Sequence, residues 1–317
     1  MHHKPILIVP GQIKSIFFEI FFKSFKNKKF LSPLILICSI KIFKENAKKF
    51  NFKKQFKLID SELNKLKLNN QCVYIIDVKL KKDRIKLRFE NEYLSKCFDV
   101  AFSILKNKHT DKFLNGPINK KNFLNKKYCG ITEFISEKFN KKDNGMLIYN
   151  KELSVCPLTT HLPLKLVSKQ ISKKLIKDKL KIINSFYLKN FKFKPRIAVT
   201  GLNPHCESIL SFNEDEKIVA SAIKNSKKNK ILVNGPFPAD TIFLKQNREK
   251  YDVILGMYHD QVLTPFKTLF EYDAINITMG LPFLRVSPDH GPNEKMVGKN
   301  LSNPTSLTKA LEFLDKN

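Results

Sequence analysis

The sequence predicts an α/β protein built on a largely parallel sheet, and three observations lead to this prediction. Short apolar runs rich in Ile, Val and Leu recur along the chain, at the lengths typical of buried strands. Longer amphipathic stretches separate several of them, which is the alternation expected of parallel strands covered by helices. The 317 residues, 42% of them hydrophobic, suffice for one large domain or two closely packed ones.

The expected elements follow from these patterns in chain order. The strands are predicted at the apolar runs Ile6–Val9, Leu34–Ile40, Val73–Val78, Leu153–Leu158, Arg196–Thr200, Ile231–Val233, Val253–Met257 and Ala274–Thr278. Helical spacing of apolar residues predicts helices at Leu164–Leu188, Glu214–Asn225 and Ser306–Leu314. The segment Phe43–Leu68, rich in Lys and Phe, is expected to be a helix-bearing excursion. No long segment repeats, which argues against a solenoid.

The charge balance is strongly basic. The chain has 58 Lys and Arg residues against 29 acidic ones, for a formal net charge of +29. Such a charge is typical of proteins that bind nucleic acid or anionic membranes. However, Lys is scattered through almost every segment, and Arg, which is preferred for bidentate contacts to phosphates and bases, is rare. An A+T-rich coding sequence produces the same excess of Lys, Asn, Ile and Phe. We therefore expect no nucleic-acid partner.

The cysteines and the apolar runs indicate the cellular compartment in which the protein is expected. The 6 cysteines form no CxxC pair, which argues against a zinc ribbon and against a disulfide-stapled secreted domain. The first residues lack the pattern of a signal peptide, and Glu19 interrupts the apolar run Ile16–Phe22. No stretch reaches the roughly 20 apolar residues that a spanning helix needs. We expect a cytoplasmic protein with no membrane partner.

Three histidines lie within a few residues of the end of an expected strand, beside Pro, Asn or Asp: His161, His205 and His259. In open α/β sheets, ligands bind at the carboxyl ends of the strands. Three imidazoles with open coordination positions suit a catalytic Zn²⁺ or a similar divalent ion that acts as a Lewis acid. Their long spacings match no local metal motif, and a single loop or core histidine needs no metal. Position alone leaves a metal site and a structural role as equal alternatives.

Other polar residues in these clusters suit an anionic substrate. Lys267, Asn276 and Arg285 would together fit a phosphate or a carboxylate. Arg285 is flanked by apolar residues, and a buried Arg needs an anionic partner. Asp240, in a loop after an expected strand, could face a metal, bind the substrate or cap the following helix. The chain has no GxGxxG, so no standard Rossmann site is expected and no cofactor-binding residue is assigned.

At these clusters the chain resembles the 4-hydroxythreonine-4-phosphate dehydrogenase family of vitamin B6 biosynthesis. The matching strings occur in family order: Asn115-Gly116-Pro117-Ile118-Asn119-Lys120, Thr159-Thr160-His161-Leu162-Pro163-Leu164, Gly201-Leu202-Asn203-Pro204-His205, Asn234-Gly235-Pro236, Ala239-Asp240-Thr241, Met257-Tyr258-His259-Asp260-Gln261, Asn276-Ile277-Thr278, Gly280-Leu281-Pro282-Phe283 and Asp289-His290-Gly291. As a set these strings are highly specific, and a weaker similarity extends over nearly the whole chain.

The resemblance implies a three-layer α/β/α fold like that of isocitrate and isopropylmalate dehydrogenases. Residues 1–317 would form a single catalytic chain of two interleaved α/β subdomains, with the active site in the cleft and boundaries that the sequence does not resolve. The enzyme would be a homodimer with a shared active site. In the family the three histidines bind a divalent metal (Zn, Mg or Co), two from one subunit and the third from its partner.

The resemblance also implies roles for single residues and a reaction. Family residues that bind the substrate correspond to Thr132, Lys267, Asn276 and Arg285, and Asp240 is our candidate for the base. NAD is the implied oxidant. The implied reaction oxidises 4-phosphonooxy-threonine (4-hydroxythreonine 4-phosphate), and decarboxylation then gives 3-amino-2-oxopropyl phosphate for pyridoxal 5'-phosphate biosynthesis.

Two departures from the family pattern leave alternatives open. Ile131 stands where the family has His in Gly-His-Thr-Glu, and its side chain forms no hydrogen bond. The segment Pro10–Ile16 replaces a glycine-rich Gly-Asp-Pro-x-Gly-Ile-Gly loop, so less room remains for the backbone to approach a ligand. A related dehydrogenase of a four-carbon sugar-acid phosphate (threonate or erythronate 4-phosphate) and a catalytically impaired metal-binding homologue therefore remain alternatives.

Overall fold

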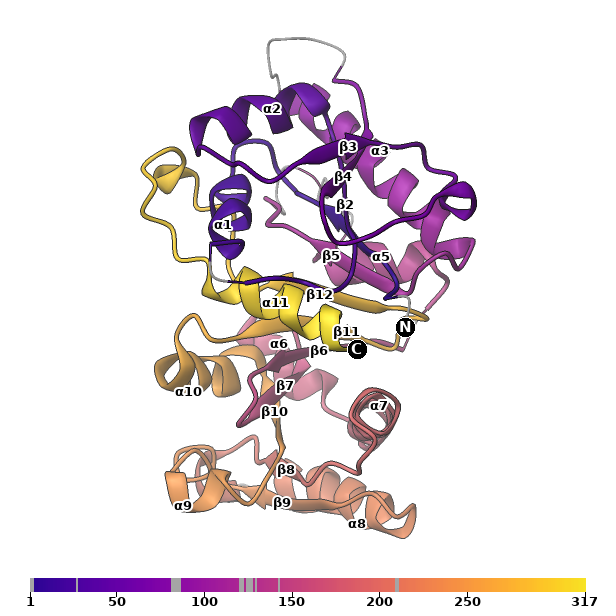
Figure 1. The fold of residues 1–317 in the computed structure, drawn as a ribbon. Helices are drawn as coiled ribbons and strands as arrows, with labels where there is room; N and C mark the ends of the chain where they lie inside the picture. Colours follow the sequence, from indigo (N-terminus) through magenta and orange to yellow (C-terminus); the bar gives the residue numbers. More distant parts are fainter. Residues whose placement is uncertain are drawn as a thin grey trace. The chain divides into compact units, whose positions relative to one another are not determined.

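The computed structural model describes residues 3–26, 28–80, 87–119, 123, 128, 130–141, 143–208 and 211–317. Its internal contacts divide the chain into two compact units (Figure 1). Unit 1 consists of Met1–Ile131 and Pro282–Asn317, and unit 2 consists of Thr132–Leu281. Unit 2 is therefore inserted into the sequence of unit 1.

Unit 1 contains a parallel sheet in which the described strands are ordered β3-β4-β2-β1-β5-β12. In chain order the strands are β1 (Ile6–Val9), β2 (Leu34–Cys38), β3 (Phe56–Leu58), β4 (Val73–Asp77), β5 (Lys112–Asn115) and β12 (Leu284–Pro288). Its helical elements are α1 (Phe17–Ser24), α2 (Ile40–Lys49), η1 (Leu63–Lys65), α3 (Leu87–Lys106), η4 (Glu294–Met296) and α11 (Thr305–Lys316). Strands β1 and β2 are continuous apolar runs because parallel strands are buried on both faces.

The apolar run around Glu19 forms the buried helix α1. Glu19 is only 2% exposed, and its carboxylate accepts hydrogen bonds from Lys23 Nζ at 2.8 Å and from the Ser302 backbone N–H at 2.6 Å. Phenylalanine rings pack around the helix, and the Phe22 and Phe52 rings stack with centroids 4.4 Å apart. Much of the phenylalanine excess at this end of the chain is therefore core packing. None of the helices in the described part of the chain combines the length and apolarity needed to cross a membrane.

Unit 2 contains a mixed sheet with its described strands in the order β11-β6-β7-β10-β8-β9. They are β6 (Gly145–Tyr149), β7 (Ser154–Thr159), β8 (Ile197–Thr200), β9 (Val233–Phe237), β10 (Val253–Tyr258) and β11 (Ile275–Met279). The helical elements are α5 (Ile131–Lys138), α6 (Leu164–Gln170), α7 (Lys173–Asn190), η2 (Pro204–Cys206), η3 (Asp215–Ala220), α8 (Ser221–Lys228), α9 (Lys245–Arg248) and α10 (His259–Phe270). Only β6 runs antiparallel to its neighbours, so the other described strands end at one edge.

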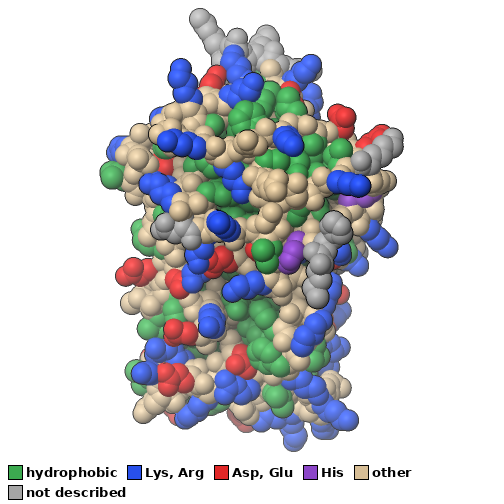
Figure 2. All heavy atoms as spheres, viewed as in Figure 1, with side chains coloured by type: hydrophobic (Ala, Val, Ile, Leu, Met, Phe, Trp, Pro, Cys, Tyr) green, Lys and Arg blue, Asp and Glu red, His purple; other side chains and the backbone are tan. Residues whose placement is uncertain are grey.

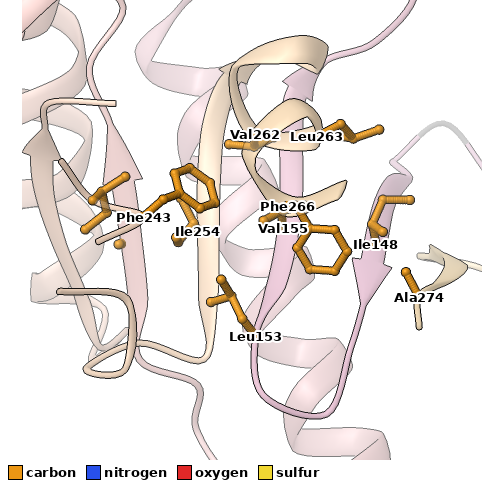
Figure 3. Packing of buried hydrophobic residues seen from close by; sticks show 11 residues of the cluster. Ile148, Leu153, Val155, Phe243, Ile254, Val262, Leu263, Phe266 and Ala274 are labelled. Atoms are coloured by element: carbon orange, nitrogen blue, oxygen red, sulfur yellow. The ribbon is translucent and has the colours of Figure 1, made fainter. Parts of the chain in front are cut away.

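Helix α10 is held on this sheet by a hydrophobic cluster (Figure 3). Val262 and Phe266 of α10 are fully buried against Ile148, Val155 and Ile254 of the strands. Burial of each such side chain contributes about 1.5–3 kcal/mol. The cluster fixes the helix along its length and therefore also fixes where its first residue lies at the sheet edge.

The predicted α/β class is confirmed, with corrections to single elements. The expected helix Leu164–Leu188 is two helices, because the side chain of Ser172 accepts a hydrogen bond from the Leu175 backbone N–H and caps a new helix, α7. In the expected helix-bearing excursion Phe43–Leu68, the α-helix ends at Lys49 and is followed by β3 and η1. Strands β3, β5, β6 and β12 were not predicted.

Strand β9 also differs from the prediction. It begins at Val233 instead of Ile231 and continues through Gly235 and Pro236, which are joined by a cis peptide bond. Leu232, within the predicted strand, precedes β9 and is 50% exposed. A strand can contain Pro when it lies at a sheet edge, and β9 ends the strand order of unit 2.

Candidate active site

Two of the predicted metal ligands meet at the carboxyl edge of the unit 2 sheet. Strands β7 and β10 pair in parallel up to Thr159 and Tyr258, and Thr159 Oγ1 donates to the Met257 carbonyl at 2.8 Å. His161 follows β7, and His259 is the first residue of α10. Their ring centroids are 5.8 Å apart. Metal–nitrogen bonds of about 2.0–2.1 Å would place two imidazoles on one ion at about this separation.

His205, the third predicted ligand, lies at the same edge in the turn after β8, where its side chain is exposed. Among the described residues, no three His, Cys, Asp or Glu side chains of one chain form a metal site. The single chain thus brings together a pair of the three histidines. His161 has φ 55° and His205 has φ 56°, in the left-handed region that non-glycine residues adopt rarely and at an energetic cost. Such backbone is often found at functional sites.

The side chain of His259 has the environment typical of a metal ligand. Its Nδ1 lies 2.6 Å from Asp260 Oδ1. Histidines that bind metals usually donate one ring N–H to a carboxylate, which fixes the tautomer and leaves the other nitrogen for the ion. His259 would then present Nε2, so the donor set fits a divalent metal.

The loop Gly201–His205 is held by a buried carboxylate that the sequence pattern did not reveal. Asp215 is 0% exposed and accepts hydrogen bonds from the Leu202 N–H at 2.5 Å, the Asn203 N–H at 2.9 Å and Asn203 Nδ2 at 3.1 Å. A Cβ on Gly201 would lie 2.6 Å from Cys206 Sγ and 3.0 Å from Asp215 Oδ1. The glycine therefore permits the close approach of Asp215 to this loop.

Asp240, our candidate base, lies in an exposed turn after β9. The capping alternative is wrong, because helix α9 begins at Lys245 and its N-cap residue is Leu244. Burial raises the pKa of the Cys206 thiol to about 11, with Asp215, Asp240 and Glu207 adding to the rise and a backbone hydrogen bond from Gly201 opposing it. The negative charge of Asp240 therefore acts close to the His205 turn, and the neighbouring thiol remains protonated near neutral pH.

Two predicted substrate residues are associated with strand β11. Thr132 Oγ1 lies 3.3 Å from Oγ1 of Thr278, which is 2% exposed. Because side chains alternate along a strand, Asn276 and Thr278 point to the same face. Ile148 lies opposite Asn276 and packs against α10, so this is the α10 face of the sheet. Thr278 belongs to the matching string Asn276-Ile277-Thr278, and no pattern in the sequence marks it as a site residue.

Asn276 presents an acceptor for which the described part of the chain supplies no donor. Its Oδ1 is buried and has no hydrogen-bond partner among the described residues. A buried polar atom without a partner costs about 1–3 kcal/mol, so an acceptor of this kind is usually satisfied by a ligand or water. Lys267 is half-buried on α10, eight residues after His259, which corresponds to about 12 Å along the helix axis. Thr132, Lys267 and Asn276 all belong to unit 2.

Arg285 belongs to unit 1, where it occupies β12. It is 1% exposed, and its Nε donates to Asn115 Oδ1 at 2.8 Å. The predicted burial is confirmed, and one partner of the guanidinium is an amide oxygen from another matching string. Ile131 begins α5 and is half-buried. Lys120, also in a family string, lies outside the described residues.

The loop that departs from the family glycine pattern packs against its own chain. Gly11 has φ 87°, and a Cβ there would lie 2.3 Å from the Pro117 carbonyl oxygen. Gln12 Oε1 accepts a hydrogen bond from the Asn119 N–H at 3.0 Å, and the Gln12 N–H donates to the Pro117 carbonyl at 3.0 Å. Gly11, the one glycine in this loop, thus allows the loop to approach the Asn115–Asn119 segment closely.

The chain is similar to known proteins in sequence and in fold. The profile of the family described as "Pyridoxal phosphate biosynthetic protein PdxA" matches residues 29–314. The chain is similar to the 4-hydroxythreonine-4-phosphate dehydrogenase of Aquifex aeolicus, with 36% identity over 309 residues, 90% of this chain and 94% of that one. It is 39% identical over 211 residues to the protein of the same name from Sulfurihydrogenibium sp., which covers 65% of each chain. A crystal structure of 4-hydroxythreonine-4-phosphate dehydrogenase from Klebsiella pneumoniae aligns with a TM-score of 0.84 and 26% identity, over 98% of this chain and 97% of that one.

Proposed function

This chain belongs to the PdxA family of pyridoxal phosphate biosynthetic proteins, and from that premise we propose that it is an NAD- and metal-dependent 4-hydroxythreonine-4-phosphate dehydrogenase. The proposed reaction oxidises 4-phosphonooxy-threonine and releases CO₂ to give 3-amino-2-oxopropyl phosphate. The observation that carries the proposal is the His161–His259 pair at the carboxyl edge of the sheet. The proposed location is the cytoplasm.

The proposed metal site is shared between two copies of the chain. His161 and His259 of one copy would supply two ligands, since these are the histidines that the chain itself holds together. His205 of a second copy would supply the third, because it is exposed on a turn at the sheet edge. His161 and His205 both have a left-handed backbone, which costs energy and is found mainly at functional sites, so it supports their role as metal ligands.

The proposed substrate site uses Thr132, Asn276, Lys267 and Arg285. The cationic side chains would bind the phosphate or carboxylate, and Asn276 Oδ1 is an acceptor available to a substrate donor. The net charge of +29 favours the approach of an anionic substrate. Lys and Arg side chains are spread over the whole visible face in Figure 2, which supports such long-range attraction more than a dedicated nucleic-acid interface.

The chemistry divides among these groups. A bound divalent ion would supply Lewis acidity at the substrate hydroxyl, and NAD would supply the hydride acceptor. Asp240 would accept the hydroxyl proton, and its charge acts close to the His205 turn. Lys267, Asn276 and Arg285 would hold the substrate so that its hydroxyl-bearing carbon stays oriented.

A direct assay tests this function. Purified protein is mixed with NAD and 4-phosphonooxy-threonine in the presence of Zn²⁺, Mg²⁺ or Co²⁺, and NADH formation is followed. We expect NADH to form, chelation of the metal to stop its formation, and His161→Ala to abolish it. His109→Ala is the matched control, because His109 precedes β5 and lies at the amino end of that strand, whereas the proposed ligands follow the carboxyl ends of strands. NADH formation that persists after complete metal removal would refute the metal dependence.

Mixed dimers test the shared site. His205→Ala and His259→Ala are each expected to be inactive, but a heterodimer of the two contains one complete set of ligands. Random mixing should restore about a quarter of the activity, because half of the dimers are heterodimers with one intact site each. His161→Ala mixed with His259→Ala should stay inactive, since both changes affect the same pair. Equal rates of NADH formation in the two mixtures would contradict the assignment of His205 to the second copy.

Ile131 supports a second candidate, a dehydrogenase of threonate or erythronate 4-phosphate. The isoleucine replaces a family histidine that donates or accepts a hydrogen bond, and the loss of one charge-assisted bond costs about 1.5–3 kcal/mol of binding. The same assay with the sugar-acid phosphates separates the candidates. A higher kcat/KM for a sugar-acid phosphate would replace the first proposal. Metal binding without NADH from any of these substrates would favour the impaired homologue.

A further inference from the structure

A side-chain amide occupies the place where strands β8 and β10 separate. The two strands pair in parallel from Ile197 with Val253 to Val199 with Leu255, and the pairing ends there. Beyond this point, Gln261 Oε1 accepts hydrogen bonds from the Met257 N–H at 2.7 Å and from Thr200 Oγ1 at 2.8 Å. Gln261 Nε2 donates to the Gly201 carbonyl at 2.7 Å. The amide thus bridges the two diverging backbones as a peptide group would.

The orientation of this amide follows from its neighbours. Met257 N–H can only donate, so the atom facing it is the oxygen, and the Gly201 carbonyl can only accept, so the atom facing it is the nitrogen. Gly256 leaves room for the arrangement, since a Cβ there would lie 3.2 Å from Gln261 Oε1 and 2.3 Å from Val262 Cγ1. A single rotamer of Gln261 therefore ties the end of β10 to the start of the loop after β8.

We propose that Gln261 is a positioning residue for the metal site, an inference that rests on the proposed function. Its bond to Met257 fixes the backbone two residues before His259, and its bond to Gly201 fixes the loop that carries His205. The side chain makes these bonds with backbone groups, so it sets where the imidazoles lie and is not itself a ligand. Residues that orient metal ligands in this way typically change metal affinity about 10-fold to 100-fold when they are replaced.

Metal titration of the full chain tests the inference. Gln261→Met keeps the length of the side chain and removes its hydrogen bonds. We expect the Kd for Co²⁺, measured by calorimetry, to rise about 10-fold to 100-fold, and the visible absorption of bound Co²⁺ to change with the geometry of its ligands. Gln246→Met, at an exposed position on α9, is the matched control and should bind Co²⁺ as the wild-type chain does.

A second variant removes one bond only. Thr200→Val deletes the donor to Gln261 Oε1 and leaves the Met257 and Gly201 bonds, so we expect a smaller rise in Kd in the same direction. It also keeps the inference testable if Gln261→Met does not fold. Co²⁺ affinity equal to wild type in a folded Gln261→Met protein, or in Thr200→Val when the former does not fold, would overturn the positioning role. If the wild-type chain binds Co²⁺ no more tightly than His259→Ala, the proposed metal site itself is refuted, and the inference with it.

Discussion

Replacing Asp215 by Ala tests whether a buried carboxylate shapes the loop of a candidate metal ligand. In the native chain this side chain accepts three hydrogen bonds from Leu202 and Asn203, three residues or fewer before His205. Alanine removes all three acceptor contacts and leaves the backbone N–H groups of Leu202 and Asn203 without this partner, while Asn203 Nδ2 keeps its bond to Glu214 Oε2 at 3.1 Å. The loop would lose the hydrogen bonds that hold its conformation, while the sheet beneath it would remain folded.

The size of the effect follows from the same contacts. Each buried donor without a partner costs about 1–3 kcal/mol, and Leu202 and Asn203 are half-buried, so the lower end applies. Two backbone donors lose their partner, so we expect Asp215→Ala to lower the free energy of unfolding of unit 2 by about 2 kcal/mol. Asp215→Asn keeps one acceptor oxygen but turns an N–H₂ group toward loop donors, so it should lie between wild type and alanine.

Urea denaturation followed by circular dichroism measures this change. If the two units unfold independently, a spectroscopic label attached to each unit separates their unfolding transitions. Glu216→Gln is the matched control: it is the neighbouring residue on the same helical segment, its side chain is 69% exposed, and it should change stability by no more than about 0.5 kcal/mol. A loss for Asp215→Ala no larger than that of Glu216→Gln would refute the reasoning. A large loss of stability confined to unit 1 would refute it as well.

Three further predictions concern single buried groups. Asn276→Leu should leave the free energy of unfolding measured by urea denaturation unchanged or raise it, because it removes a buried acceptor for which the described residues supply no donor. It should also raise KM for the phosphorylated substrate. Arg285→Met should raise KM about 10-fold or more and lower stability by about 1–3 kcal/mol, because Asn115 Oδ1 loses its donor. Burial raises the pKa of Cys156 from 9.0 to about 11, so the unfolded chain loses this proton at a lower pH than the folded chain. The free energy of unfolding should therefore fall as pH rises from 9 to 11, by up to about 1.4 kcal/mol per pH unit. Cys156→Ala should make this fall less steep, and an identical slope in the variant would contradict the assignment.

The sequence predicted the elements whose pattern is local. Strand β1 matches the expected run Ile6–Val9, because a parallel strand buried on both faces reads as an uninterrupted apolar segment. Strands β5 and β12 were missed because they contain Lys112 and Arg285, charged residues that are nevertheless buried. Arg285 is accommodated through Asn115, 170 residues away in the chain, and no local pattern contains that information.

The candidate site was likewise predicted in part from the sequence and decided in part by the tertiary structure. Histidines that follow strands predict ligands at one sheet edge, and the family strings made His161, His205 and His259 specific candidates. Only the pairing of β7 with β10 decided that His161 and His259 lie together while His205 occupies a separate turn. The roles of Asp215 and Gln261 were hidden from the sequence for a physical reason. Each is an ordinary polar residue until folding brings it to backbone groups that have lost their partners at the end of a strand.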